Sequence, residues 1–213
     1  MTADDRLATV ALDDRDLAAE AAVDGRHRRR DRNRDAVVDA LLALYTEGRL
    51  DPSSAEIAER AGLSPRSLFR YFDDVDDLCQ AAINEQQRRV MPTAMVDASP
   101  DDPFAHRVEV IITQRLAVFH AMGTVGAVSR LRAPFQSIVA DELAGARALL
   151  RAQLNRLFRP ELAAMTKSRA TGVLAVADVV CSFEAYHLMR DDQGLTDDQI
   201  VGALQIVLTG LLS

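Results

Sequence analysis

Arginine is the residue type best placed to do chemistry in this sequence, because it gathers in two short stretches. Arg66 and Arg70 lie four residues apart, and segment 26–34 holds six arginines. A guanidinium carries its N–H donors in a planar fork that fits phosphate oxygens and the edge of guanine. Both stretches are therefore suited to nucleic acid. Segment 26–34 has an alternative interpretation, a solvated arm that only aids solubility.

No spacing typical of a catalytic or metal site accompanies these arginines. The sequence has no Ser/His/Asp arrangement, no phosphate-binding glycine loop and no metal-ligand pattern. His106, His120 and His187 are dispersed, and Cys79 and Cys181 lie far apart, as expected of reduced cysteines in a core. We therefore expect no enzymatic activity, no cofactor and no metal.

Two short helices around a tight turn are predicted to position the first pair of arginines. Ser53 and Glu56 have the spacing of a capping box, which predicts the start of the first helix. Gly62 predicts its end, because a glycine readily adopts the left-handed conformation that follows a helix. Ser64 can cap the second helix, whose first residue is then Pro65.

The second of these helices is predicted to bury one side and expose the other. Leu68 and Phe72 lie four residues apart on one face, whereas Arg66, Ser67 and Arg70 point elsewhere. A short helix with a buried seam and an outer row of polar side chains suits the DNA major groove. An ordinary helical hairpin with solvated arginines is the alternative.

This stretch resembles the DNA-binding domain of the TetR family of transcriptional regulators. The resemblance covers about residues 34–78 and fixes residue types at many positions. The matching residues are Ile57, Ala58, Ala61, Gly62, Leu63, Ser64, Leu68, Phe69, Tyr71, Phe72 and Leu78. It implies an all-α fold with an N-terminal three-helix helix-turn-helix DNA-binding domain and a C-terminal helical domain for ligand binding and dimerisation.

DNA contacts are assigned on the combined evidence of residue type and resemblance. Arginines on the second helix are expected at base edges or near phosphates, and serines and aromatic residues around it are expected to position the domain on the backbone. The assigned residues are Arg26, Arg28, Arg29, Arg30, Arg34, Ser53, Ser54, Ser64, Pro65, Arg66, Ser67, Phe69, Arg70 and Tyr71.

One position departs from the family pattern. Val75 stands where the family usually has a lysine that contacts phosphate, and aspartates flank it at 73, 74, 76 and 77. Acids at a helix N-terminus offset the helix dipole, yet near DNA they repel phosphates. We therefore expect the missing phosphate contacts to come from the arginine arm at 26–34, which can reach along the backbone or into the minor groove.

Three regions are predicted along the chain. Residues 1–25 are expected to form a mobile acidic extension, residues 26–78 the DNA-binding domain with its basic arm, and residues 79–213 the helical effector and dimerisation domain. The net charge is −7, but screening makes the local arginine cluster decisive for a phosphate. No secretory signal is recognised, and the apolar run 200–212 is too short to span a membrane, so a cytoplasmic location is expected.

The helix pattern can be placed coarsely. Apolar spacing predicts helices at about 33–47 and 75–91, one through Met122, and a short one ending near Arg132 after interruption by Gly123 and Gly126. Three long helices should follow at about 135–158, 164–190 and 196–211.

The last two helices are candidates for a homodimer interface. Both are apolar on more than one side, and the second side must be covered by something. The resemblance implies a four-helix interface between two subunits, and the alternative is that these helices fill a monomer core. The interface residues assigned are Val173, Val176, Val180, Leu204, Val207, Leu208 and Leu211.

The resemblance also implies a largely apolar cavity for a small-molecule effector between the middle helices. Any single aromatic residue there is more often part of an ordinary core than of a cavity wall. The lining residues assigned are Phe104, Ile111, Arg115, Phe119, His120, Phe135, Phe183 and Tyr186.

Together these features predict a homodimeric repressor that binds a pseudo-palindromic double-stranded operator and is released from it by a small molecule. Three alternatives remain open: an activator or architectural DNA-binding protein without effector response, a helical enzyme, and a regulator that has lost DNA binding. The acidic residues around Val75 motivate the last of these.

Overall fold

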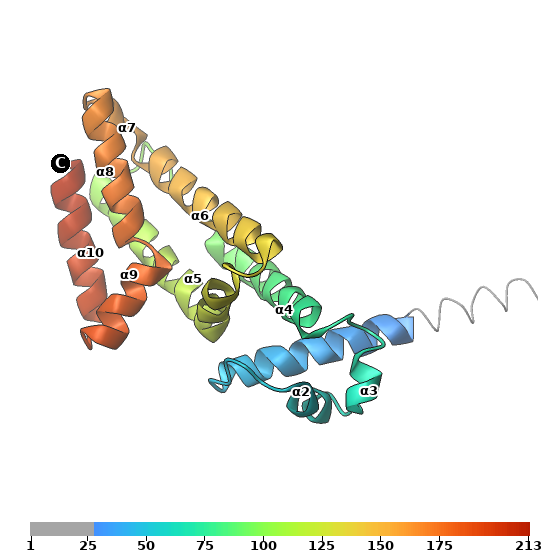
Figure 1. Ribbon diagram of the computed structural model, residues 1–213. Helices are drawn as coiled ribbons and strands as arrows, with labels where there is room; N and C mark the ends of the chain where they lie inside the picture. Colours follow the sequence, from blue (N-terminus) through green and yellow to red (C-terminus); the bar gives the residue numbers. More distant parts are fainter. Residues whose placement is uncertain (1–27) are drawn as a thin grey trace, which may run out of the picture. The chain divides into compact units, whose positions relative to one another are not determined.

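The computed structural model describes residues 28–213, and the described chain is helical without strands (Figure 1). Within these residues it divides into two compact units, 28–82 and Ile83–Ser213, and the division falls inside helix α4 (Val75–Val90). The all-α fold class is therefore confirmed for the described residues. The extension predicted at 1–25 and Arg26 lie outside them.

The first unit is built on one long helix that covers residues 28–46 in the described chain. Helices α2 (Ser54–Arg60) and α3 (Pro65–Leu68) and the first turns of α4 pack against it around a small apolar core. The Tyr45 hydroxyl donates a hydrogen bond to the Cys79 sulfur at 3.2 Å inside this core.

The predicted helix signals around α2 and α3 are confirmed. Ser53 and Glu56 form a reciprocal capping box, and the Ser64 side chain accepts a hydrogen bond from the Ser67 amide. Gly62 follows α2 with φ +69°, and the amide of Leu63 donates to the Ala58 carbonyl at 2.8 Å. This is the bond pattern of a Schellman motif, which uses the left-handed glycine to turn the chain sharply into α3.

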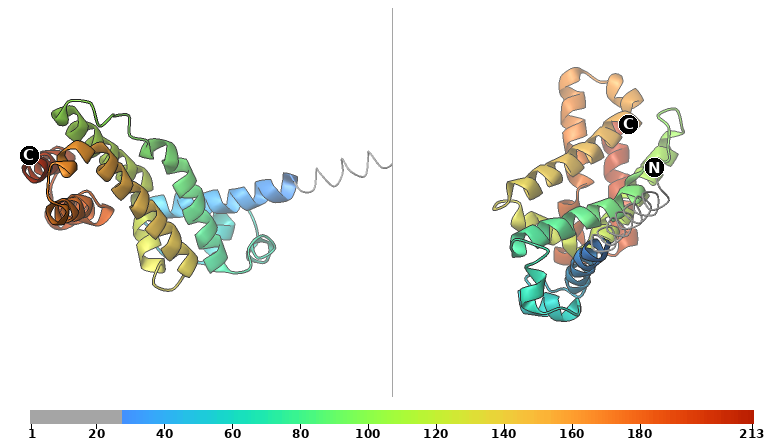
Figure 2. Two further views of the ribbon diagram at one scale, coloured as in Figure 1. Left: turned by 90° about the horizontal axis from the view of Figure 1, so that it is seen from above. Right: turned by 90° about the vertical axis from the view of Figure 1, so that its right-hand side faces the viewer.

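The second unit is a helical bundle arranged around α5 (Phe104–Arg132). Helix α5 packs against α6 (Ser137–Leu157) and α10 (Asp197–Leu212), while α8 (Lys167–Val180) packs against α6 and α10. Helices α8 and α10 run side by side (Figures 1 and 2). The remaining short elements are η1 (Met91–Ala94), α7 (Arg159–Ala163), α9 (Phe183–His187) and the π-helical turn η2 (Leu188–Asp192).

The prediction of one long helix at 164–190 is wrong, because the helix ends at Val180 and a second helix begins at Phe183. Ser182 starts α9 by accepting a hydrogen bond from the Ala185 amide at 3.1 Å. The break redirects the chain, so that Phe183 and Tyr186 pack into the core against Phe119.

The glycines of α5 have different roles from those predicted. Gly123 breaks the helical geometry with φ 46° and ψ −137°, as expected of an interruption. Gly126 instead stays within the helix, and a Cβ atom there would lie 2.5 Å from the Phe183 ring. The second glycine therefore permits close packing of α9 on α5.

A buried ion pair joins α5 to α7. Arg107 is buried, and its guanidinium donates two hydrogen bonds to the Glu161 carboxylate, one to the Leu157 carbonyl and one to the Asp102 carbonyl. These bonds lower the pKa of Glu161 below its usual range. The ion pair thus neutralises the charge of Arg107, which would otherwise be buried among the apolar residues of α5 without a partner.

Within residues 28–213, α5 is the helix that meets the length and composition criteria for a membrane span, and α8 with Phe183–Asp192 meets them as a bent pair. The run 200–212 considered above is not that helix. Half of the most apolar window of α5 is buried in the second unit, and the helix carries buried Arg107, Gln114 and Arg115. These are features of the central helix of a bundle.

Candidate DNA-binding surface and ligand cavity

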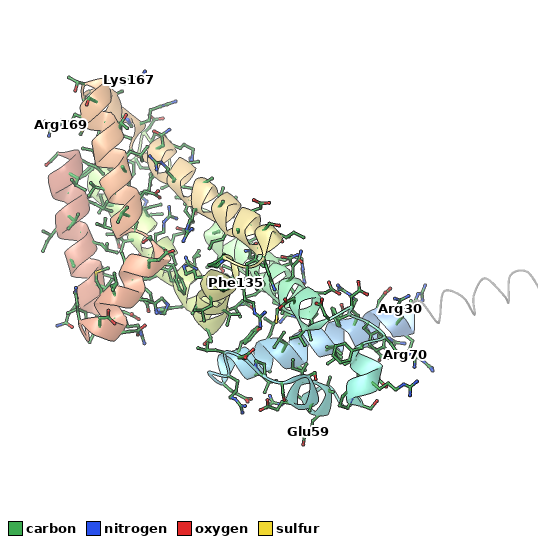
Figure 3. All side chains as sticks on the ribbon, in the orientation of Figure 1. Arg30, Glu59, Arg70, Phe135, Lys167 and Arg169 are labelled. Atoms are coloured by element: carbon green, nitrogen blue, oxygen red, sulfur yellow. The ribbon has the colours of Figure 1, made fainter. Side chains whose placement is uncertain are left out.

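Helix α3 and the turn that follows it present two exposed guanidinium groups, those of Arg66 and Arg70. Leu68 is fully buried and Phe72 almost so, whereas Arg66 and Arg70 are exposed. Within the described residues neither arginine has a hydrogen-bond or ion-pair partner in the first unit or elsewhere. Figure 3 labels Arg70, which lies in the turn after α3. Both guanidinium groups are thus available to an external acceptor.

Ser53, Ser64 and Tyr71, three of the residues predicted to position the domain on a DNA backbone, already form hydrogen bonds within the unit. The amide and hydroxyl of Ser53 both donate to Glu56 at 2.8 Å, and the Ser64 hydroxyl lies 2.9 Å from that of Ser67. Phe69 is 46% exposed, while the Tyr71 hydroxyl accepts a hydrogen bond from Asn33. Ser54 is the first residue of α2 and Pro65 the first of α3.

The arginines from residue 28 onward are part of a helix and not of an extended arm. Asn33 bonds Tyr71 at 2.8 Å, and the Arg34 guanidinium lies over the Phe72 ring at 4.8 Å. The start of the described helix therefore lies beside the end of α3, and exposed Arg29 and Arg30 lie on the turn before these contacts. Residues 28–34, which were predicted as an arm preceding the helix, therefore belong to the helix itself.

Two of the aspartates near Val75, Asp74 and Asp77, accept hydrogen bonds at the start of α4. The Asp77 amide donates to the Asp74 carboxylate at 2.8 Å, and the Asp73 amide donates to the Asp77 carboxylate at 3.2 Å. These bonds cap the N-terminus of α4 in a reciprocal manner, since the first amides of a helix have no partner within it. The acids are thus explained by capping without reference to DNA.

The second unit contains a cavity of about 430 Å³. Its walls come from the end of α4 with η1, from α5, α6 and α8, and from the start of α9. Thirteen of its twenty lining residues are apolar when Cys181 is included, which suits a largely apolar small molecule.

Two arginines and a glutamate form the polar end of this cavity. Arg130 donates to both oxygens of Glu184 and lies 4.0 Å from the centre of the Phe183 ring, and Arg147 also pairs with Glu184. Burial by itself raises the pKa of Glu184, but the hydrogen bonds from the two arginines lower it to about 2. Glu184 is therefore ionised at neutral pH.

A further arginine is buried behind the cavity wall. Arg115 is 0% exposed, and its guanidinium donates to the side chains of Gln114 and Gln153 and to the carbonyl of Leu150, a lining residue. Burial lowers its pKa to about 10, so it keeps its proton at neutral pH. Burial likewise raises the pKa of the Cys181 thiol to about 11, which leaves it protonated.

Comparison with solved structures identifies this arrangement of helices. A transcriptional regulator from Rhodococcus sp. RHA1 superposes with a TM-score of 0.66 at 17% identity, covering 84% of this chain and 95% of that one. A TetR family transcription regulator from Marinobacter aquaeolei VT8 gives 0.57 at 21% identity, covering 86% and 97%. The chain has the TetR-family fold.

Sequence comparison points to the same class over a shorter stretch. Helix-turn-helix-type transcriptional regulators from two strains of Mycobacterium tuberculosis are 36% identical over 92 residues, or 42% of this chain. The match spans 45% of their length, so less than half of these relatives is covered. No protein-family model matches the chain. The resemblance noted for residues 34–78 is confirmed by these comparisons.

Within this TetR fold, the residues assigned to effector binding fall into several places. Phe119 and Phe183 line the cavity. The others do not line it: Phe104 packs on Phe158, Ile111 is in the core, Arg115 is behind the wall, Phe135 is 88% exposed, and His120 and Tyr186 bond each other.

His120 and Tyr186 belong to a polar network that joins α5, α9 and α10. The His120 ring contacts both the Tyr186 hydroxyl at 2.9 Å and the Asp197 carboxylate at 3.1 Å, and Arg190 donates to the same two groups. These partners hold the start of α10 in place, which gives the pair a structural role.

The residues assigned to a dimer interface divide between core and surface of the TetR fold. Val173, Leu204 and Leu208 are buried within the unit, and Val180 and Leu211 are half-buried. Val176 and Val207 are exposed beside two residues that the sequence reasoning missed, Val179 and Ile206, the latter 76% exposed. An apolar surface therefore lies on adjacent α8 and α10.

The polar residues of the cavity were also missed. Arg130, Arg147 and Glu184 lie on three different helices, separated by up to 54 residues, and only the folded chain brings them together. No periodicity or short motif could reveal such a cluster, although an arginine in the apolar stretch around Arg130 was a weak signal.

Proposed function

We propose that the chain is a sequence-specific DNA-binding transcriptional regulator that acts as a homodimer in the cytoplasm and is released from its operator by a small molecule. One observation carries the proposal: α3 and the turn after it expose Arg66 and Arg70, both without partners in the described chain, from a helix-turn-helix with a buried opposite face. No catalytic step is part of this function.

DNA reading is assigned to α3 in the major groove. A guanidinium can bond both O6 and N7 of guanine, which discriminates against other bases by about 1–3 kcal/mol. Arg29, Arg30 and the exposed Phe69 are proposed to position the domain on the backbone, with Ser54 at the N-terminus of α2. Arg26 would extend this contact.

Dimerisation is assigned to the exposed apolar surface of α8 and α10. Two recognition helices must lie about 34–36 Å apart to enter successive major grooves, which requires a second subunit. Val176, Val179, Ile206 and Val207 provide an apolar patch on adjacent helices that a second copy can cover.

Effector control is assigned to the cavity of the second unit. Helix α4 supports this because Gln87, Val90 and Met91 line the cavity while Leu78 and Cys79, on the same helix, belong to the core of the first unit. A ligand that binds the non-DNA state more tightly would weaken operator binding, typically by about 1–3 kcal/mol of coupling.

Selection of bound sequences from a random duplex library tests the proposal. The expected result is an enriched site with two inverted half-sites, centred one helical turn apart or a multiple of it. A regulator that has lost DNA binding would enrich nothing, and an architectural protein would enrich shape or composition without half-sites. A regulator without effector response would retain its site whatever small molecule is titrated.

The dimer can be tested by a charge at the centre of the apolar patch. The chain, of 23.3 kDa, should sediment at twice this mass at micromolar concentration, and Ile206→Asp should sediment as a monomer. Burying an unpaired polar group costs on the order of 3 kcal/mol, or about 100-fold in affinity. Ile138→Asp is the matched control, since Ile138 is also exposed but lies on α6. A wild-type monomer, or a dimeric Ile206→Asp, would refute the interface.

A further inference from the structure

Around the cavity the negative charges have ion-pair partners, whereas one positive charge does not. The two carboxylates in its lining, Glu184 and Asp178, both have arginine partners: Arg130 and Arg147 for the first, Arg151 for the second. Within the described residues no lining carboxylate therefore lacks a cation, and a cationic ligand would find no unpaired partner there.

The guanidinium of Arg115 is the group that lacks an opposite charge. Its hydrogen-bond partners in the described chain are two neutral glutamine side chains and the Leu150 carbonyl, and its buried Nε atom has none. Asp178 attracts it without forming an ion pair. A fully buried charge with only neutral partners is costly, so an anion in the adjacent cavity is favoured.

Arg147 provides the contact that such an anion needs. It lines the cavity with its side chain 54% exposed and uses one Nη atom to bond Glu184, while its Nε and second Nη have no acceptor in residues 28–213. A guanidinium offers five N–H donors, and a carboxylate can bind two of them without disturbing Glu184. The Ser182 hydroxyl, which lines the cavity and accepts from the Ala185 amide, has its own hydrogen available.

We propose that the cavity binds an apolar monocarboxylate, with the carboxylate at Arg147 and Ser182 and the apolar body between Val118, Phe119 and Leu150. This inference rests on the proposed function in taking the cavity as the effector site, and it assigns the chemical class of that effector. Arg115 acts behind the wall as a fixed positive charge that favours an anion over a neutral analogue.

Three probes with one alkyl chain and different charges test the assignment: decanoate, decan-1-ol and decylammonium, each titrated calorimetrically into the full chain below its aggregation limit. Decanoate is expected to bind with a stoichiometry of one per chain and at least tenfold more tightly than the alcohol, and the ammonium more weakly still. Equal or tighter binding of the alcohol or the ammonium, or no binding of decanoate, would overturn the proposal.

Variants locate the carboxylate. Arg147→Gln should weaken decanoate about tenfold and leave decan-1-ol within twofold, whereas Arg147→Lys should retain part of the preference. Arg169→Gln is the matched control, because Arg169 is an exposed arginine of α8 outside the cavity lining (Figure 3). Ala146→Trp should fill the cavity and remove binding of both probes. Unchanged decanoate affinity in Arg147→Gln or Ala146→Trp would place the ligand elsewhere and refute the site.

The outcome also separates this inference from the proposed function. If decanoate binds as expected but does not weaken operator binding at saturation, the proposal of an anionic ligand is supported and the proposal that the ligand controls DNA binding is refuted. If a palindromic operator is selected but decanoate does not bind, the proposed DNA-binding function is supported and the proposal of a carboxylate ligand is refuted.

Discussion

Replacing Arg66 and Arg70 together with alanine should abolish sequence-specific operator binding. Each arginine that bonds a guanine in the major groove contributes about 1–3 kcal/mol of discrimination, so the double change should cost about 2–6 kcal/mol. Non-specific affinity should fall less, because it depends on phosphate contacts that these substitutions leave largely in place. Titration of the selected operator and of a scrambled duplex at one salt concentration measures both effects.

The fold should survive this double substitution. Arg66 and Arg70 have no partners in the described chain, and α3 is held by the Ser64 cap and by buried Leu68. The free energy of unfolding in urea should therefore change by less than about 0.5 kcal/mol per site. A large loss of stability would show that the side chains serve the fold.

The control must remove the same charge from another surface. Lys167 and Arg169 lie at the start of α8, where Figure 3 labels them, and replacing both with alanine also removes two positive charges. This variant should bind the operator within about twofold of wild type at physiological salt, because the charges are screened over about 8 Å. If both double variants lose the same affinity, net charge and not α3 determines binding, and the assignment of base-reading residues fails.

Replacing Arg107 with methionine should cost about 3–5 kcal/mol of stability, the range measured when one partner of a buried ion pair is removed. Methionine retains much of the apolar stem, so the loss comes from the charged head. Glu161 and the carbonyls of Asp102 and Leu157 would remain with four hydrogen bonds unmade. Urea unfolding followed by circular dichroism gives the change.

The pair also predicts a pH dependence. The hydrogen bonds from Arg107 lower the pKa of Glu161 in the folded state, so its stabilisation is present above the ordinary pKa of a glutamate and is lost as pH falls through the folded value. Wild type and Arg107→Met should therefore converge in stability at acid pH. Arg88→Met is the control, since Arg88 pairs with Glu85 in an exposed position and should cost less than about 1 kcal/mol. Equal costs for the two variants would contradict the role given to burial.

Local signals allowed the first unit to be predicted from the sequence in some detail. Ser53, Glu56, Gly62 and Ser64 each act on backbone groups within a few residues, so their types alone determine where α2 begins and ends and where α3 begins. Leu68 and Phe72 are both buried as their spacing predicts, although α3 ends at Leu68 and Phe72 lies beyond it. The exposure of Arg66 and Arg70 then follows from the burial of these two residues.

The second unit could not be predicted to the same depth, because its decisive contacts join distant segments. No glycine or proline marks the end of α8 at Val180. Ser182 is the N-cap of α9, but the apolar residues before and after it follow a continuous helical pattern, so the cap could not be recognised. Arg115 is accommodated by Gln153 from another helix, which sequence spacing does not reveal. The assigned cavity residues were accordingly a mixture of core, wall and surface.

Helix α4 is shared by the two units, and this sharing has a thermodynamic consequence. Its sixteen residues form one hydrogen-bonded ladder that begins among the core residues of the first unit and ends in the cavity wall of the second. Helix opening is cooperative, so fraying at Val90 and fraying at Leu78 are not independent fluctuations. Under the proposed function, a ligand that restricts Val90 and Met91 would reduce the conformational entropy of the turns of α4 in the first unit, and occupancy of the cavity would change the entropy cost of DNA binding without any large movement.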